Sequence, residues 1–208
     1  KLTISGGDIK VNADGDGIDM NGSGYMTGGT VVVYGPTNNG NGALDYDGVF
    51  EINGGTLLTA GSSGMAMAPS SGSTQYTIAN TVGSQASGTE VKLVDSSGNT
   101  IASFTPTKEY AHVVISSPDL KNGSTYTLYA GSTEIGTFTL SSVISGDTSS
   151  NSMPGGHGNS GGTAPTDGDS GATPPQGGGP GGNPPQGERP AGGPDGVPPQ
   201  DGQSGDIQ

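Results

Sequence analysis

The sequence contains no cysteine and no tryptophan, and it has few basic residues. Without cysteine, neither a disulfide nor a thiolate-bound metal can form. Only 6 of the 208 residues are Lys or Arg, against 19 Asp or Glu, which gives a formal net charge of −13. A surface of this charge repels nucleic-acid phosphates and attracts divalent cations, so we expect no nucleic-acid partner.

Long apolar runs and helical periodicity are also missing. No segment approaches the roughly 20 apolar residues of a membrane-spanning helix, so we expect no membrane insertion. Gly accounts for 42 residues and hydrophobic residues for only 28% of the chain, a composition that favours short strands joined by tight turns. We therefore predict an all-β protein. Because the chain begins at Lys1 within a strand pattern, we expect a trimmed part of a secreted or cell-surface protein.

An internal repeat occupies the first 70 residues. Three short segments rich in β-branched and apolar residues, 2–11, 25–33 and 50–59, each contain a Gly-Gly pair. The pairs recur after about 22 and then about 26 residues, which is the length of one coil of a parallel β-helix. We predict that residues 1–73 are such rungs, each a strand, a Gly-Gly corner and a second strand, stacked in register.

The remaining sequence divides into two further segments. Residues 74–144 lack the Gly pairs and show longer alternating strands, which predict an antiparallel β module that caps the open end of the β-helix. Hairpins are expected there around 95–99, around 121–123 and at Gly131. Residues 145–208 consist largely of Gly, Pro, Gln, Ser and Asp, which predicts a disordered tail.

Acidic residues cluster in the first two repeats. Asn12, Asp14 and Asp16 alternate along the chain and are followed by Gly, as in the first half of a calcium-binding loop, and Asp19 follows closely. Aligning the repeats places Asp19 over an aspartate of the next repeat. The alternative is that these Asp-Gly and Asn-Gly pairs only form turns. The candidate Ca²⁺ ligands are Asn12, Asp14, Asp16, Asp19, Asp45 and Asp47.

Tyr25, Tyr34 and Tyr46 are candidate ligand-binding residues, since aromatic faces stack on sugar rings. For Tyr46, strand alternation offers the alternative of a core position, opposite Asp45 and Asp47. Enzymatic activity is not expected. The carboxylates form possible glycosidase pairs without a visible aromatic cleft, and the lone His112 and the other histidine of the chain form no catalytic arrangement.

The repeats resemble a family of bacterial carbohydrate-binding-domain proteins of Clostridia and related Firmicutes. The resemblance rests on four stretches, 15–22, 27–33, 35–48 and 54–66, and covers about residues 1–144. It implies a right-handed parallel β-helix related to polysaccharide lyases, which binds calcium and acidic plant polysaccharide such as pectin without clear lyase activity. By the matching motifs it places the cation on Asp14, Asp16, Asp19, Asp45 and Asp47.

Two functions of different classes follow from these observations. The first is an extracellular, calcium-dependent protein that binds polysaccharide without catalysis. The second is a structural, self-assembling cell-surface or filament protein, because an open β-helix end exposes strand edges that template further strands. The partners would be an acidic glycan in the first case and further copies of the chain in the second.

Overall fold

Every regular element of the described residues is a β-strand, and the all-β class is confirmed. The structure is a computed structural model that describes residues 1–147. Among these residues no helix is long and apolar enough to cross a membrane. The strands are β1 Leu2–Asn12, β2 Ile18–Met20, β3 Gly24–Tyr34, β4 Leu44–Tyr46, β5 Phe50–Gly61, β6 Thr77–Gln85, β7 Val91–Asp95, β8 Thr100–Phe104, β9 Tyr110–Ser116, β10 Thr125–Ala130, β11 Thr133–Thr139 and β12 Ile144–Gly146.

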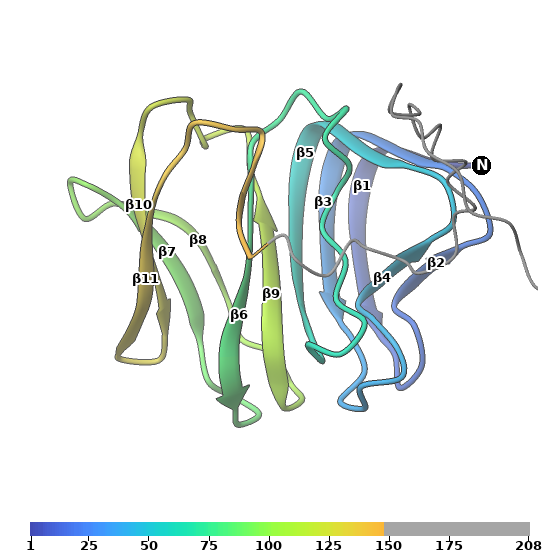
Figure 1. Ribbon diagram of the computed structural model, residues 1–208, viewed down its shortest axis with the longest axis horizontal. Coiled ribbons are helices and arrows are strands. Elements are labelled where there is room, and N and C mark those ends of the chain that lie inside the picture. Colours follow the sequence, from blue (N-terminus) through green and yellow to red (C-terminus); the bar gives the residue numbers. More distant parts are fainter. Residues whose placement is uncertain (148–208) are drawn as a thin grey trace, which may run out of the picture. The chain divides into compact units, whose positions relative to one another are not determined.

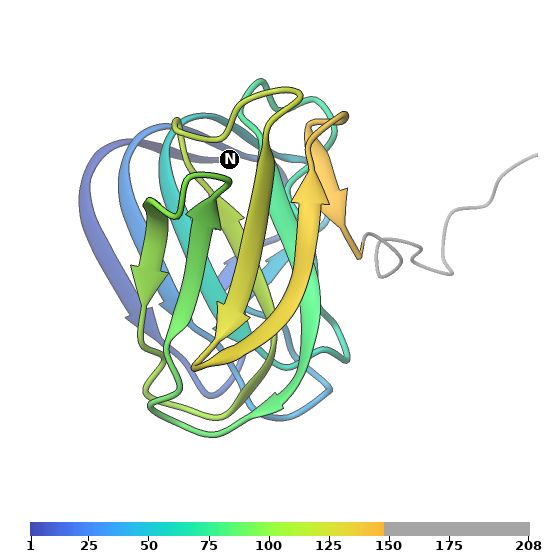
Figure 2. The ribbon, with the colours of Figure 1, turned by 90° about the vertical axis from the view of Figure 1, so that its left-hand side faces the viewer.

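The strands form three sheets that lie in layers (Figures 1 and 2). A central six-stranded sheet has the order β1-β3-β5-β9-β6-β12, a four-stranded sheet has the order β11-β10-β7-β8, and β2 pairs with β4. One hydrophobic cluster contains side chains of both the central and the four-stranded sheet, among them Ile115 and Leu128. A second cluster joins the other face of the central sheet to β2 and β4, through Met26, Val31 and Leu44. The central sheet is therefore buried on both faces over much of its width.

The repeat forms the parallel part of the central sheet. β1 pairs in parallel with β3, and β3 with β5, each residue lying beside its equivalent in the neighbouring repeat. The Gly pairs lie at register irregularities inside these long strands, not at corners between separate strands as the sequence predicts. Gly7, Gly29 and Gly55 have φ values of 86°, 87° and 87°. A Cβ at Gly29 would lie 2.7 Å from Gly7 O. Both the backbone conformation and the close neighbouring strand therefore require glycine.

The parallel stacking of the repeats ends at β5. The N–H groups of Phe50 and Ile52 donate to the hydroxyl oxygens of Ser70 and Ser73, at 2.9 and 3.0 Å. These side chains take the place of a next strand along the first half of β5. The second half, Leu57–Gly61, pairs antiparallel with β9. The segments predicted as rungs and as a cap thus share one continuous sheet.

Two of the three predicted hairpins are present and one is not. β10 and β11 pair antiparallel across Gly131, as predicted. β7 and β8 pair antiparallel around residues 95–99, as predicted. The hairpin expected around 121–123 is wrong, because β9 lies in the central sheet and β10 lies in the four-stranded sheet. The reason is that Val113, Val114 and Ile115 are all at most 1% exposed. A strand that is apolar on both faces must be covered by a layer on each side, and β9 has both layers in the central sheet.

The last strand corrects the boundary of the predicted tail. Residues 144–146 form β12, which pairs in parallel with β6, so regular structure includes the first two residues of the predicted tail, 145 and 146. Residues 148–208, which hold the rest of the predicted disordered tail, lie outside the described residues.

Candidate functional site: an acidic ladder and a hydroxyl pocket

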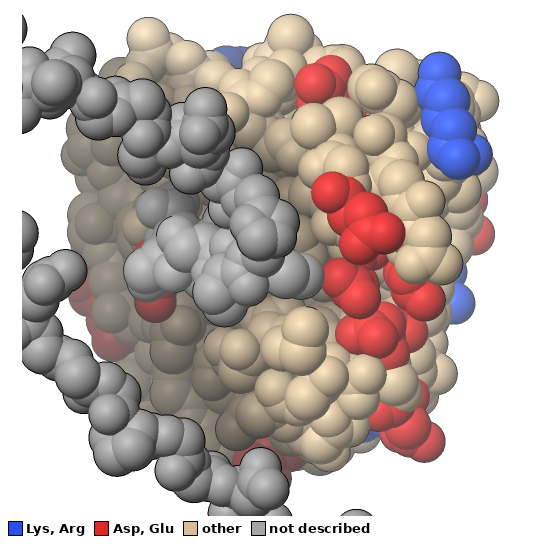
Figure 3. Space-filling view, turned by 45° about the vertical axis from the view of Figure 1, so that its right-hand side comes forward, with Lys and Arg blue, Asp and Glu red and all other residues tan. Residues whose placement is uncertain are grey.

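Pairing of β2 with β4 brings aspartates of two repeats side by side. Asp19 is the register partner of Asp45, flanked by the buried pairs Ile18–Leu44 and Met20–Tyr46. Since successive side chains of a strand point to opposite faces, the aspartates point outward. Figure 3 shows acidic side chains gathered in a band on the side of the molecule where β2 and β4 lie. We call Asp16, Asp19, Asp45 and Asp47 the acidic ladder.

The carboxylates of the ladder repel one another. The pKa of Asp45 is raised above its usual value, first by partial burial and then by the charges of Asp16, Asp19 and Asp47, against a smaller opposing hydrogen bond with Tyr46. Asp16 is also fixed in place, because its Oδ1 accepts a hydrogen bond from the Gly42 N–H at 2.7 Å. A cation near Asp45 would relieve this repulsion.

The first two residues of the predicted calcium loop have other partners. Asp14 Oδ1 lies 2.6 Å from Lys108 Nζ, which also donates to the Ala13 carbonyl at 2.7 Å. Lys108 lowers the pKa of Asp14. Asn12 Nδ2 donates to Thr107 Oγ1 at 3.5 Å. The sequence pattern did not predict the contact between Asp14 and Lys108, since the two residues are more than 90 positions apart along the chain.

Residues 1–147 contain no group of three or more Asp, Glu or His close enough to hold a metal ion. The six predicted ligands are therefore not gathered into one coordination shell. Four of them form the acidic ladder, and two face the segment that precedes β9. Calcium binding stays a prediction, and the residues that fit it are those of the ladder.

Burial removes two of the three tyrosines from a candidate sugar-binding surface. Tyr46 is 5% exposed, and its hydroxyl donates to the Ala68 carbonyl at 2.5 Å. This core position agrees with the alternative interpretation of Tyr46, which was based on strand alternation. Tyr34 is 6% exposed, and the Lys10 ammonium lies 4.9 Å from its ring centroid. Tyr25 is partly exposed, with the Lys1 ammonium 4.8 Å from its ring centroid.

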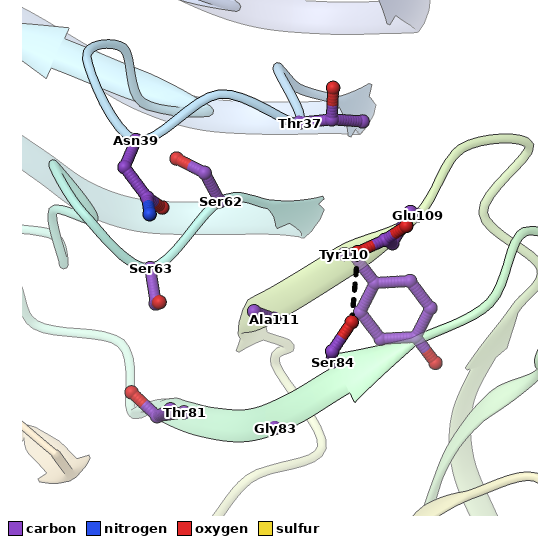
Figure 4. Close-up of a pocket in the computed structure, with 10 residues that line it drawn as sticks. All are labelled: Thr37, Asn39, Ser62, Ser63, Thr81, Gly83, Ser84, Glu109, Tyr110 and Ala111. Carbon is purple, nitrogen blue, oxygen red and sulfur yellow. Dashed lines mark hydrogen bonds between the residues drawn. The ribbon is translucent and has the colours of Figure 1, made fainter.

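A pocket that the sequence did not indicate lies between the loops after β3 and β5 and the strands β6 and β9 (Figure 4). Its volume is about 320 Å³. We call it the hydroxyl pocket, because serine and threonine side chains make up half of its lining. These are Thr37, Ser62, Ser63, Thr81 and Ser84.

Several groups of the hydroxyl pocket are held in place by hydrogen bonds. Ser84 Oγ donates to Glu109 Oε1 at 2.8 Å, the contact drawn in Figure 4. Ser62 Oγ donates to the Asn41 carbonyl at 2.7 Å. Tyr110 forms part of the wall. Its burial raises the pKa of its hydroxyl to about 12. Four separate stretches of the chain contribute to the pocket, so no local motif could have revealed it.

Comparison with known proteins adds no assignment. No protein-family model, no curated protein and no solved structure matches this chain. The acidic ladder and the hydroxyl pocket are the features from which we infer a function.

Proposed function

We propose that this chain is an extracellular, non-enzymatic protein that binds acidic polysaccharide through calcium ions at the acidic ladder. We further propose that residues 1–73 are rungs of a right-handed parallel β-helix and that residues 74–144 cap it. The parallel, in-register pairing of β1, β3 and β5, and of β2 with β4, supports this architecture. The observation that carries the function is the position of Asp45 among three other carboxylates on an outward face.

The incomplete metal shell favours an ion shared with a ligand. Ca²⁺ takes six to eight oxygen ligands. Asp19 and Asp45 lie on adjacent strands, which are roughly 4.8 Å apart in a sheet, so both can approach one ion. Uronate carboxylates and water would complete the coordination. A chain of net charge −13 repels a polyanion, so the bridging ion is also what makes the two surfaces compatible.

Titration calorimetry with polygalacturonate tests this proposal. We expect binding by the full chain in millimolar calcium and loss of binding in excess EDTA. The double variant Asp19→Asn/Asp45→Asn should bind at least about tenfold more weakly. Asp119→Asn, an exposed aspartate in the connection between β9 and β10, is the matched control and should bind like the parent. Binding that persists in EDTA would overturn the calcium bridge.

A self-assembling structural protein is the second candidate, and the edges of two sheets favour it. Within residues 1–147, β1 and β2 are the last strands of their sheets, and Ile9 of β1 is 39% exposed. An exposed edge with an apolar side chain can pair with another chain. Sedimentation velocity over a range of concentrations tests this. Growth of large species that Ile9→Lys suppresses would support assembly, and a constant monomer would exclude it.

A further inference from the structure

We infer that the hydroxyl pocket is a second binding site, which takes one unit of a neutral sugar without a metal ion. The inference is independent of the calcium-bridged function, because no residue of the acidic ladder lines the pocket. It rests on the chemistry of the lining, on the size of the pocket and on the hydrogen-bonding state of its side chains.

The lining matches a ligand with many hydroxyl groups. Each serine or threonine hydroxyl both donates and accepts, and the Asn39 amide does so through separate atoms. Glu109 adds a carboxylate, which accepts hydrogen bonds from hydroxyl groups. A sugar ring, with several hydroxyls on one small frame, can use donors and acceptors set around it in this way.

The charge of the pocket selects against acidic ligands. No Lys or Arg lines it, so a carboxylate or phosphate on the ligand would find no counter-ion. Glu109 would repel such a group, and Asp147 lies near, since its Oδ2 accepts a hydrogen bond from Thr81 at 3.1 Å. The ligand class is therefore a neutral sugar, in contrast to the polyanion proposed for the acidic ladder.

The size of the pocket limits the ligand to about one ring. Its volume of about 320 Å³ lies at the lower end of the range of roughly 300–1,000 Å³ for small-molecule sites. Gly83 and Ala111, on β6 and β9, have little or no side chain and leave this space open (Figure 4). They also provide a less polar wall for the C–H groups of a sugar ring.

Some polar groups of the pocket are already oriented, and others are available. The hydrogen bond from Ser84 fixes one oxygen of Glu109 and leaves the carboxylate capacity for further donors. Within residues 1–147, the side chains of Thr37, Asn39 and Ser63 form no hydrogen bond. In Figure 4, Asn39 and Ser63 lie on the opposite side of the space from Ser84. A bound sugar would thus meet polar partners from two sides.

Binding of neutral sugars in the presence of EDTA tests the inference. The probes are glucose, galactose, mannose and xylose, titrated into the full chain to about 50 mM and followed by saturation-transfer NMR and calorimetry. We expect at least one of them to bind, and galacturonate to bind at least about tenfold more weakly than its neutral counterpart galactose. If none of the four binds, or if galacturonate binds as well as galactose, the inference is overturned.

Variants place the binding in the pocket. Ser63→Trp, on the partly exposed loop after β5, fills it and should abolish sugar binding with an unchanged melting temperature. Ser71→Trp, on an exposed turn outside the pocket, is the matched control and should bind as the parent does. Glu109→Gln keeps the shape and removes the charge, so the preference for galactose over galacturonate should shrink. Sugar binding that survives Ser63→Trp would overturn the site.

The same variants separate this inference from the proposed function. Ser63→Trp should leave calcium-dependent polygalacturonate binding unchanged, and Asp19→Asn/Asp45→Asn should leave neutral-sugar binding unchanged. Loss of both activities in either variant, with an unchanged melting temperature, would contradict the independence of the two sites.

Discussion

The two halves of the described residues, the repeat half (1–61) and the half that follows it (62–147), fill their cores in different ways. In β1, β3 and β5 the same positions recur from repeat to repeat, and the glycine pairs let neighbouring backbones come close. In β9 the packing is done by side chains, with Val113, Val114 and Ile115 enclosed between two layers. Backbone geometry therefore restricts which residues are tolerated in the first half, and side-chain volume restricts which residues are tolerated in the second.

The two halves meet along the hydrogen bonds between β5 and β9. Because this contact is a backbone ladder inside a continuous sheet, we expect the halves to unfold together. Substitutions that act on one half alone then report on the stability of the whole, and their relative sizes show which kind of packing is less tolerant.

The largest expected effect comes from adding one methyl group at a glycine pair of the repeat. In Gly29→Ala the new Cβ would combine a φ of +87° with a distance of 2.7 Å to Gly7 O. We expect a loss of about 4 kcal/mol in the free energy of unfolding. Gly98→Ala in the β7–β8 hairpin has a φ of +84° and open space around the Cβ, so it should lose only about 1–2 kcal/mol.

Urea denaturation of both variants measures this difference. If the two substitutions cost the same, strain at positive φ alone explains the glycines, and the close approach of neighbouring strands in the repeat has no energetic consequence.

The same contrast explains what the sequence could predict of the fold. The repeat was visible because glycine pairs recur at nearly constant spacing and the strands they mark stack on their own equivalents. The neighbours of β9 were not visible, because a short apolar run carries no information on which strands lie beside it. Nor did any local pattern show that β6, β9 and β12 would extend the sheet begun by the repeat.

A smaller effect is expected from acid. Burial lowers the pKa of His112 to about 4 from an ordinary 6.5, against a weaker opposing effect of Asp147. The Nε2 atom of His112 is buried and has no hydrogen-bond partner. The unfolded chain takes up a proton as the pH falls below 6.5, whereas the folded chain does not until about pH 4. Stability should therefore fall across this window, by about 3 kcal/mol.

Urea denaturation at pH 7, 5.5 and 4.5 tests this expectation. His112→Leu removes the titrating group, so its stability should fall less than that of the parent between these pH values. Parallel curves for the two proteins would mean that the histidine is protonated equally in both states, in conflict with its burial in β9.

The candidate sites show the same limits of sequence information. The register of Asp19 with Asp45 followed from aligning the repeats and agrees with the pairing of β2 and β4. The other contacts of Asn12 and Asp14 did not, because they are made with Thr107 and Lys108, which belong to the other half of the described residues. Strand alternation in the sequence indicated that Tyr46 could be internal. It gave no such indication for Tyr34, which packs in one cluster with side chains of the four-stranded sheet, far away along the chain.

The smallest expected effect concerns the ion pair between Asp14 and Lys108, which is a side-chain contact between the two halves. The side chain of Asp14 is 99% exposed and that of Lys108 is 20% exposed. An ion pair this open to water contributes little to stability, so Lys108→Met should leave the urea midpoint nearly unchanged. Lys108 lowers the pKa of Asp14, so any contribution of the pair is present at neutral pH and is lost as acid protonates the carboxylate.

Carboxyl NMR of Lys108→Met should accordingly show the pKa of Asp14 rising towards its ordinary value, with Lys92→Met as a control that leaves it unchanged. A destabilisation as large as that expected for His112 would mean that side chains at the ion pair, and not only the β5–β9 ladder, hold the halves together. An unchanged midpoint would instead leave Asp14 free to exchange its lysine for another cation at little structural cost. In that case Lys108→Met should strengthen calcium binding if Asp14 takes part in it, and leave it unchanged if the acidic ladder alone binds the ion.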